Sequence, residues 1–392
     1  MKKNQKFLYP AEISNHETIL SNLEKTLNWY ISNKFNCNID LFSAEWITTP
    51  IMEKVFNLFY NKFNTTEIRP HAINLADNML FINYPDIVKK VENYIEKFEK
   101  DLNIKIVFSA SIDGKYCDFG RTEENDEFYE NVFKFVLNHR FGLHPMISST
   151  NIRYWIDNYL WFEQYLTPNQ MLDIMTLEVR NVDWDEESIG YLIQFCDFLT
   201  DKVYNYFNKD VDKMFDYVFG MKSTQLNYST IRLKPSDLTK VSCRQQNNLC
   251  IRMGDLSVAP CHRLFYPQLI AGHFESNDTT LLEFEPENLA NYIVSRKMKR
   301  NNLPYCEECE WSVFCPGHCH GASYEHSGNQ YVPTVGVCNL FKAKYAFLLY
   351  KYNYLGLFTQ KNISKLDSTL AKQVLTLANN TLSKFYGGDL ND

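Results

Sequence analysis

The sequence predicts an α/β fold: a parallel sheet covered by helices, followed by a smaller cysteine-rich domain. Short apolar strands alternate with amphipathic helices across residues 1–230, and eight of the 11 cysteines crowd into residues 243–338. A chain of 392 residues is long enough for one large domain and a second, smaller one, each with its own core. We therefore expect three parts: a domain at 1–230, a cysteine-rich domain at 231–345, and a C-terminal helical cap and tail at 346–392.

Each expected element follows from hydrophobic spacing and turn residues. The segment 84–100 carries Val88, Val91 and Ile95 at helical spacing, and the strand 104–112 ends in the turn pair Asp113-Gly114. Alternation of strands and helices produces a parallel sheet whose ligands gather at the carboxyl ends of the strands. In order along the chain, we expect helix 15–32, strand 38–44, helix 51–63, strand 69–75, helix 84–100, strand 104–112, helix 126–140, strand 143–149, strand 171–179, helix 186–207, hairpin 249–262, and helices 287–299 and 341–354.

The cysteine pattern carries the strongest chemical signal. Its core is Cys306-x2-Cys309-x5-Cys315-x3-Cys319, preceded by Cys243, Cys250 and Cys261 and followed by Cys338. Thiolates at such spacings bind soft metals, because tight turns bring each pair to one ion or cluster. Two [4Fe–4S] clusters would use all eight thiolates. Two zinc sites are the alternative, although zinc ribbons usually pair two Cys-x2-Cys knuckles and the x5 and x3 spacings do not form a second one.

The composition indicates a cellular compartment and limits the kinds of partner that we expect. The opening stretch MKKNQKFLYPAEIS has no apolar signal segment, so we expect a reducing cytoplasm in which thiolates stay available for metal, not disulfides. The net charge is −7 with no basic block, which argues against a nucleic-acid partner. No apolar run approaches the roughly 18 residues of a membrane span. Cys37, Cys117 and Cys196 stand apart in the sequence and are expected as small buried hydrophobic side chains.

The cysteine core and its flanking cysteines resemble the SPASM domain of radical S-adenosylmethionine (SAM) enzymes. The resemblance to anaerobic sulfatase-maturing enzymes within that group implies two auxiliary [4Fe–4S] clusters and a pattern of ligands that crosses between them. The first cluster would take Cys243, Cys250, Cys261 and Cys319, and the second would take Cys306, Cys309, Cys315 and Cys338.

The first 230 residues resemble the radical SAM barrel at two places. Ser43-Ala44-Glu45-Trp46 stands where the family has Gly-Gly-Glu-Pro, and Ser111-Ile112-Asp113-Gly114 followed by Asp118-Phe119-Gly120-Arg121 stands where it has Ser-x-Asp-Gly and Asp-x-x-Arg. The resemblance implies that Glu45, Ser111, Asp113 and Arg121 form a SAM site. Glu45 would contact the SAM amino group, and Ser111 and Arg121 would hold its carboxylate, for which a guanidinium is suited. The implied fold is a partial (β/α)6 TIM-like barrel missing its first strand, plus a C-terminal cysteine-rich SPASM domain.

One departure from the family leaves three explanations open. Radical SAM enzymes hold their SAM-cleaving cluster with Cys-x3-Cys-x2-Cys, and no such triplet occurs in this sequence. A third [4Fe–4S] cluster is therefore not expected. The sequence is truncated, or it is a degenerate homologue that no longer cleaves SAM, or it is half of a split enzyme whose first strand comes from a partner.

The expected function follows from the family. The resemblance implies a radical-based oxidoreductase that matures a side chain of a peptide or small protein substrate. The first alternative is a non-catalytic SPASM subunit that presents a peptide to an active enzyme. The second alternative is a structural zinc-binding protein.

Overall fold

A computed structural model describes most of the chain, in two compact units. The first unit is drawn from residues 1–112, 119–143 and 245–297, and the second from residues 113–118, 144–244 and 298–392. The three domains expected from the sequence, 1–230, 231–345 and 346–392, remain predictions. The described residues are 15–42, 46–117, 125–179, 184–204, 206, 249–274, 282–284, 305–311, 319–354 and 368–386.

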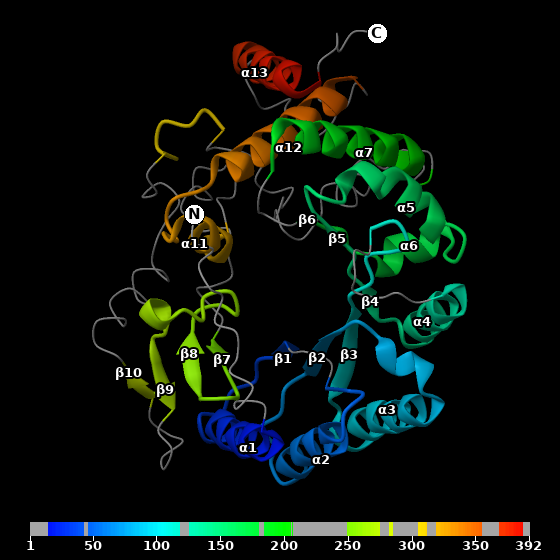
Figure 1. Cartoon of the computed structure of the whole chain (residues 1–392), viewed down its shortest axis with the longest axis vertical. Helices are drawn as coiled ribbons and strands as arrows, with labels where there is room; N and C mark the ends of the chain where they lie inside the picture. The colour runs from blue at the N-terminus through cyan, green and yellow to red at the C-terminus, as the bar shows by residue number, and fades with distance from the viewer. Residues whose placement is uncertain are drawn as a thin grey trace. The chain divides into compact units, whose positions relative to one another are not determined.

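The first unit contains the predicted parallel sheet. Strands β1 (Ile39–Phe42), β2 (Ala72–Asp77), β3 (Lys105–Ala110) and β4 (Gly142–Leu143) lie side by side in the order of the chain, all parallel (Figure 1). Helix α1 (His16–Ser32) precedes β1, and α2 (Ile51–Asn64), α3 (Pro85–Lys97) and α4 (Asp126–His139) connect successive strands. The mixed α/β class and the parallel sheet are therefore confirmed, because parallel neighbours require such crossovers.

One face of this sheet is buried under aromatic side chains. Alternate residues of β2 and β3 are buried, and Phe108 of β3 contacts Phe81 and Phe135, with ring centroids 5.4 and 6.3 Å apart. The residues that alternate with the buried ones along β2 and β3 are half-buried, apart from Lys105, which is exposed. On this more open face, the Asn74 amide donates a 2.5 Å hydrogen bond to Asp40 of the neighbouring strand. The sheet therefore packs on one face and presents polar groups on the other, which gives the period-2 burial of its strands.

Polar caps set where several helices begin and end. The Asn15 side chain accepts from the Glu17 amide at the start of α1, and the Asn125 side chain accepts from the Phe128 amide at the start of α4. Such caps satisfy amides that have no partner within the helix. Helix α4 ends at Arg140 in the left-handed conformation (φ 56°), and the ends of both helices lie close to those expected from the sequence.

Three expected strands are wrong in extent. The strand expected at 69–75 begins only at Ala72, after Pro70, which has no N–H to pair. The strand expected at 143–149 is two short strands, β4 and β5 (Met146–Ile147), on either side of Pro145.

The strand expected at 171–179 is helical at its start. Helix α6 (Pro168–Ile174) covers 171–174, and the strand is confined to β6 (Glu178–Val179), paired in parallel with β5. The reason is a capping box in which Thr167 and Gln170 bond reciprocally, with a proline at the first helical position. Together these features nucleate a helix.

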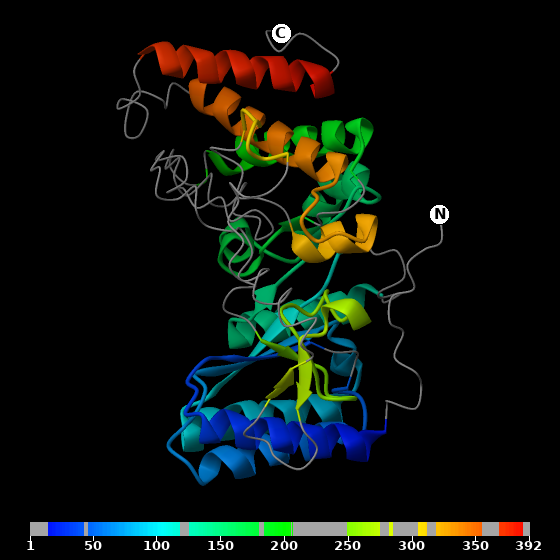
Figure 2. The same ribbon diagram turned by 90° about the vertical axis from the view of Figure 1, so that its left-hand side faces the viewer.

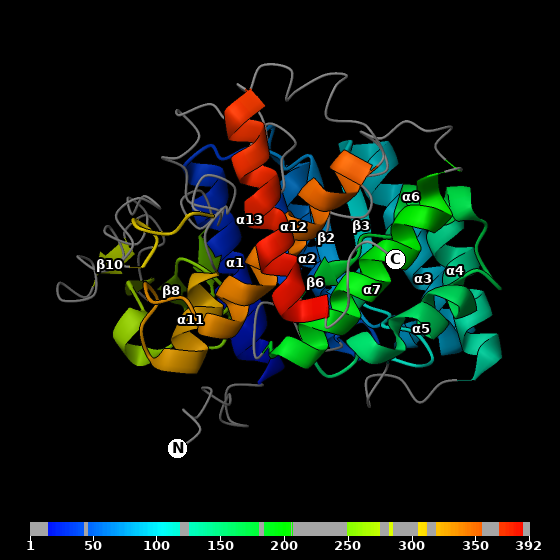
Figure 3. The same cartoon turned by 90° about the horizontal axis from the view of Figure 1, so that it is seen from above.

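The second unit contains a layer of three long helices. Helices α7 (Glu186–Tyr204), α12 (Val335–Tyr354) and α13 (Ser368–Tyr386) pack on one another, as Figures 2 and 3 show for α12 and α13. A Cβ at Gly336 would overlap the carbonyl oxygen of Trp184, so this close approach requires glycine. Among the described helices, none is both long enough and apolar enough to cross a bilayer.

Helix α12 begins six residues before the expected 341–354. Cys338 therefore lies in its first turn, where its amide donates to the Thr334 carbonyl at 3.0 Å. The Thr334 hydroxyl accepts from the Val337 amide at 3.2 Å and provides the capping signal that hydrophobic spacing alone did not reveal. The helix expected at 287–299 lies outside the described residues.

The isolated cysteines divide between two environments. Cys117 and Cys196 are buried, as expected, whereas Cys37 is exposed, so that expectation is wrong. Cys37 follows the end of α1, where Lys34 takes a left-handed conformation, and its carbonyl accepts a 2.7 Å hydrogen bond from the Tyr30 hydroxyl. This turn leaves the thiol outside the core.

Two buried lysines of α12 face α7. Lys351 forms ion pairs with Asp197 at 2.5 Å and Asp201 at 3.4 Å. Lys344 is wholly buried beside Cys196, and burial lowers its pKa to about 8, against the opposing effect of the thiol. Burial raises the pKa of Cys196 to about 12, so this thiol is protonated and inert at neutral pH.

We expect replacement of Lys344 by Met to remove a rise of stability with pH. Below pH 8 the ammonium is charged in both the folded and the unfolded state. Between pH 8 and the ordinary pKa of 10.5, only the unfolded state keeps the proton, so the free energy of unfolding rises with pH, by on the order of 3 kcal/mol. Lys344→Met has no such proton to lose and should lack this rise. Urea unfolding from pH 7 to 10 measures it. The exposed Lys384→Met on α13 is the control, and parallel curves for Lys344→Met and the parent would contradict the expectation.

Candidate metal and cofactor sites

The expected cysteine hairpin at 249–262 is confirmed in the first unit. Strands β7 (Cys250–Ile251) and β8 (Ser257–Ala259) are antiparallel, with Cys250 opposite Ala259. Strands β9 (Gly272–Phe274) and β10 (Leu282–Phe284) extend them into a four-stranded sheet of order β10-β9-β8-β7. Cys261 follows β8, and its carbonyl accepts from the Leu264 amide at 2.9 Å. The hairpin therefore presents two thiols of the first expected site, while Cys243 lies outside the described residues.

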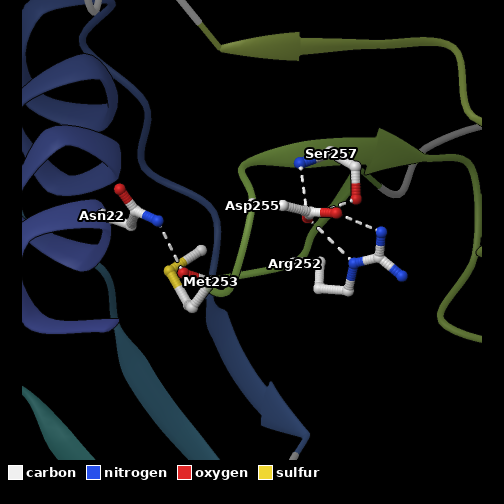
Figure 4. Close-up of polar contacts among 5 residues, drawn as sticks. All are labelled: Asn22, Arg252, Met253, Asp255 and Ser257. Carbon is white, nitrogen blue, oxygen red and sulfur yellow. Dashed lines mark hydrogen bonds and ion pairs between the residues drawn. The ribbon is translucent and has the colours of Figure 1, made fainter. Parts of the chain in front are cut away.

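A polar network closes the turn of this hairpin (Figure 4). The Asp255 carboxylate accepts from the Arg252 guanidinium at 2.9 Å, from the Ser257 amide at 3.1 Å and from the Ser257 hydroxyl at 2.7 Å. Burial opposes the charge of Asp255, but these hydrogen bonds outweigh it and lower its pKa. Leu256 between them is buried in a left-handed conformation (φ 58°). Such a conformation is costly for a leucine, so the turn is held in one geometry by its neighbours.

Three cysteines of the second expected site, Cys306, Cys309 and Cys338, lie in the described part of the second unit. The Cys309 amide donates to the Cys306 carbonyl at 3.3 Å, which closes the tight turn that a Cys-x2-Cys pair needs. The pKa of Cys338 is raised to about 11, chiefly by burial and to a smaller extent by Cys306 and Cys309, while the Lys342 ammonium one helical turn away opposes this rise. Cys338 is therefore within electrostatic reach of both thiols of the turn. Cys315, the fourth expected ligand, lies outside the described residues.

Cys319 begins helix α11 (His320–Ser327). Its sulfur accepts from the Ala322 amide at 3.5 Å and serves as the helix cap. A negative charge is favourable at this end of a helix, because the amides and the helix dipole point toward it. Cys319 belongs to the second unit and Cys250 and Cys261 to the first, so its assignment to the first cluster stays a prediction.

Thiolates are ligands that soft metals prefer. Within the described ranges, no group of three or more His, Cys, Asp or Glu side chains is arranged to hold a single metal ion. The turn at Cys306 and Cys309 has the local form that a Cys-x2-Cys ligand pair needs for either a zinc ion or an iron–sulfur cluster.

Two of the four expected SAM contacts lie in the described chain. Ser111 directly follows β3, where it is half-buried, and its amide donates to the Asp77 carbonyl at 2.7 Å. This bond continues the β2–β3 pairing past the carboxyl ends of the strands. Asp113 is buried two residues later. Glu45 and Arg121 lie outside the described residues.

The structure gives Asp113 a contact within the protein. Its carboxylate accepts from the Met146 amide at 2.7 Å, at the start of β5. Its carbonyl accepts from the Asn158 amide at 2.7 Å, and the Asn158 oxygen accepts from the Tyr116 amide at 3.2 Å. Asn158 is wholly buried on helix α5 (Trp155–Phe162). The loop after Asp113 is therefore held by one side chain 45 residues away in sequence.

Sequence reasoning missed Asn158 and a second asparagine. Asn151 binds the Ser148 amide at 2.8 Å and the Met146 carbonyl at 2.9 Å, and accepts from the Trp155 indole at 3.1 Å. The available signal was a polar side chain within an apolar helix, because a buried amide must have partners. That signal identifies Asn158 as bonded but does not identify the loop that it binds.

Comparison with known proteins adds no further assignment. No family model matches this chain. No curated protein matches it either. The resemblance to radical SAM and SPASM proteins therefore stays a prediction from the sequence motifs.

Replacing Gly114 by Ala should destabilise the loop that follows β3. A Cβ there would lie 2.5 Å from the Asn158 oxygen, and Gly114 has φ +92°. Crowding and backbone strain together predict a loss of roughly 2–4 kcal/mol. The matched control is Gly328→Ala, which also has positive φ (+74°) but open space around its Cβ, so only the backbone cost of about 1 kcal/mol applies. Urea unfolding measures both variants, and equal losses would show that Asn158 does not restrict the site.

Proposed function

We propose that this chain is a SPASM-type protein of the radical SAM group, with two auxiliary four-iron clusters, that acts in radical maturation of a peptide or small protein. The tight turn between Cys306 and Cys309, which a Cys-x2-Cys ligand pair needs, supports the proposal together with the spacing of the eight cysteines. A reducing cytoplasm suits such a protein, because thiolates remain available there.

The thiols of this chain would hold both clusters. A bound cluster would supply a site that accepts one electron from the substrate during maturation. The protein contributes turns, a hairpin and a helix cap that present the sulfurs. The proposed ligands are Cys243, Cys250, Cys261 and Cys319 for the first cluster, and Cys306, Cys309, Cys315 and Cys338 for the second.

The carboxyl edge of the parallel sheet is the proposed place for SAM and substrate. Ligands of parallel α/β sheets bind beyond the carboxyl ends of the strands, where Ser111 follows β3. We assign the SAM carboxylate to Ser111 and Arg121, and the SAM amino group to Glu45. Asp113 uses its carboxylate on the Met146 amide, so we assign it to holding the loop and not to contacting SAM.

A non-catalytic subunit is the second candidate. The 392 residues contain no Cys-x3-Cys-x2-Cys triplet, so no ligands for a SAM-cleaving cluster are present among them. Strand β1 is the end strand of the described parallel sheet, which is where a first strand from a partner or from a longer chain would pair. The DNA upstream of the Met1 codon, read in the same frame, discriminates a truncated enzyme from a subunit.

Iron content tests the cluster proposal directly. We expect protein purified without oxygen to be brown and to contain about eight iron atoms per chain, because two four-cysteine sites each bind four irons. Cys309→Ala should lose about half of this iron, and the exposed Cys37→Ala should lose none. Metal analysis with visible absorption spectra measures both. A colourless preparation with stoichiometric zinc after anaerobic reconstitution would overturn the proposal in favour of a zinc protein.

Residues 1–392 should form no 5′-deoxyadenosine from SAM and dithionite, even with their clusters loaded. Cleavage needs a cluster with an open iron, and both proposed sites are closed by four cysteines. Chromatography of the reaction products measures this. An extended chain that carries an upstream Cys-x3-Cys-x2-Cys segment should cleave SAM if the sequence is truncated, and should fail if the pocket has degenerated. Stoichiometric 5′-deoxyadenosine from residues 1–392 alone would show that the cluster assignment is wrong.

A further inference from the structure

The tip of the cysteine hairpin is bonded to helix α1. The Asn22 side-chain amide donates a 2.7 Å hydrogen bond to the carbonyl of Met253, which lies in the turn between β7 and β8 (Figure 4). Asn22 is buried, and the two residues are 231 positions apart in the sequence. The Thr26 hydroxyl, one helical turn along α1, lies 4.0 Å from the Met253 sulfur. The same face of α1 therefore contacts the turn twice.

An apolar contact supports the same docking. Leu256 and Val258 form a buried cluster of the hairpin, against which Trp29 of α1 packs together with Leu249 and Ile251. Leu249 and Ile251 flank Cys250 on either side. Burial of these side chains against the helix removes apolar surface from water and so contributes to holding Cys250, on the edge strand β7, in place.

Hydrogen bonds within the hairpin turn fix the geometry of the part that contacts α1. The hydrogen bonds of Asp255 to Arg252 and Ser257 close the turn, and the Leu256 amide donates to the Arg252 carbonyl at 2.8 Å. A turn of fixed geometry holds the Met253 carbonyl in one position relative to the two strands. The hydrogen bond from Asn22 to this carbonyl therefore orients both strands and the nearby cysteines.

We propose that Asn22 is a positioning residue for the first cluster site: by docking the hairpin tip on α1, it presents Cys250 and Cys261 to iron. This inference rests on the proposed function. Cluster assembly needs thiolates that are already near their final positions, because ordering a mobile segment costs free energy that binding must offset. Helix α1 leads directly into β1, so the docking also ties the cysteine hairpin to the parallel sheet of the first unit.

Two replacements of Asn22 separate hydrogen bonding from packing. Asn22→Asp keeps the size of the side chain but replaces the N–H donor with an oxygen that repels the Met253 carbonyl, and Asn22→Ala removes the side chain. Asn22→Gln keeps the amide and should restore much of the contact. The matched control is Asn33→Ala, which removes an exposed side-chain amide that donates to the Trp29 carbonyl within α1. Far-UV circular dichroism verifies that each variant is folded.

Hydrogen exchange of the full chain, purified without oxygen, tests the docking whether or not iron is bound. Amides of 249–262 should exchange about tenfold faster in Asn22→Asp and Asn22→Ala, because a buried hydrogen bond to the turn is lost, and should be unchanged in Asn33→Ala. Unchanged exchange in Asn22→Asp would overturn the inference.

Iron content of the same preparations tests the positioning role. Asn22→Asp should retain about half of the iron of the parent, since only the first site depends on the hairpin, and Asn22→Gln should recover most of it. A full iron complement in Asn22→Asp, despite faster exchange, would limit Asn22 to a structural role and overturn the proposal. A parent chain without iron would instead contradict the proposed function, and the exchange result would still decide the docking.

Discussion

The parallel pairing of β2 with β3 is the constraint on which the positions of the candidate SAM contacts Ser111 and Asp113 depend. The register places Asp77 opposite Ala110, and the next hydrogen bond, from the Ser111 amide to the Asp77 carbonyl, carries the pairing one step beyond the strands. Because the buried alternate residues of β2 and β3 hold this register, a slip of one residue would turn Ser111 to the opposite face. The chemistry proposed for the sheet edge therefore depends on the aromatic packing beneath it.

Buried asparagine side chains form hydrogen bonds to loops and turns that lie outside the parallel sheet. Asn158 and Asn151 organise the loop after Asp113 and the entry to α5, and Asn22 holds the turn of the cysteine hairpin. A buried carboxamide suits this role, because it donates and accepts at once and has no charge to desolvate. The candidate sites are thus built on loops whose geometry is set by single side chains of neighbouring helices.

The two expected cluster sites are supported by different kinds of local structure. Cys250 and Cys261 flank an antiparallel hairpin with a polar turn, whereas Cys306 and Cys309 share a tight turn and Cys338 and Cys319 lie at helix starts. At the start of α11, the Ala322 amide donates to the Cys319 sulfur and so favours a negative charge there. Lys342, one turn beyond Cys338, also favours a thiolate, but burial outweighs it and raises the pKa of Cys338. The cap at Cys319 and the charge of Lys342 suit the net negative charge of the proposed cluster.

The sequence by itself determined the alternation of strands and helices, the parallel sheet, the hairpin around Cys250 and the turn pair Asp113-Gly114. All of these depend on local hydrophobic spacing and turn chemistry, which a reader of the sequence can follow. The break of a strand at Pro145 and the start of α12 at its Thr334 cap also have local causes, which hydrophobic spacing alone did not reveal. Only the tertiary structure decided that Asp113 bonds to Met146, that Asn22 holds the hairpin and that Cys37 is exposed. The reason is that a side-chain hydrogen bond acquires its partner from a segment tens to hundreds of residues away, and no local pattern names that segment.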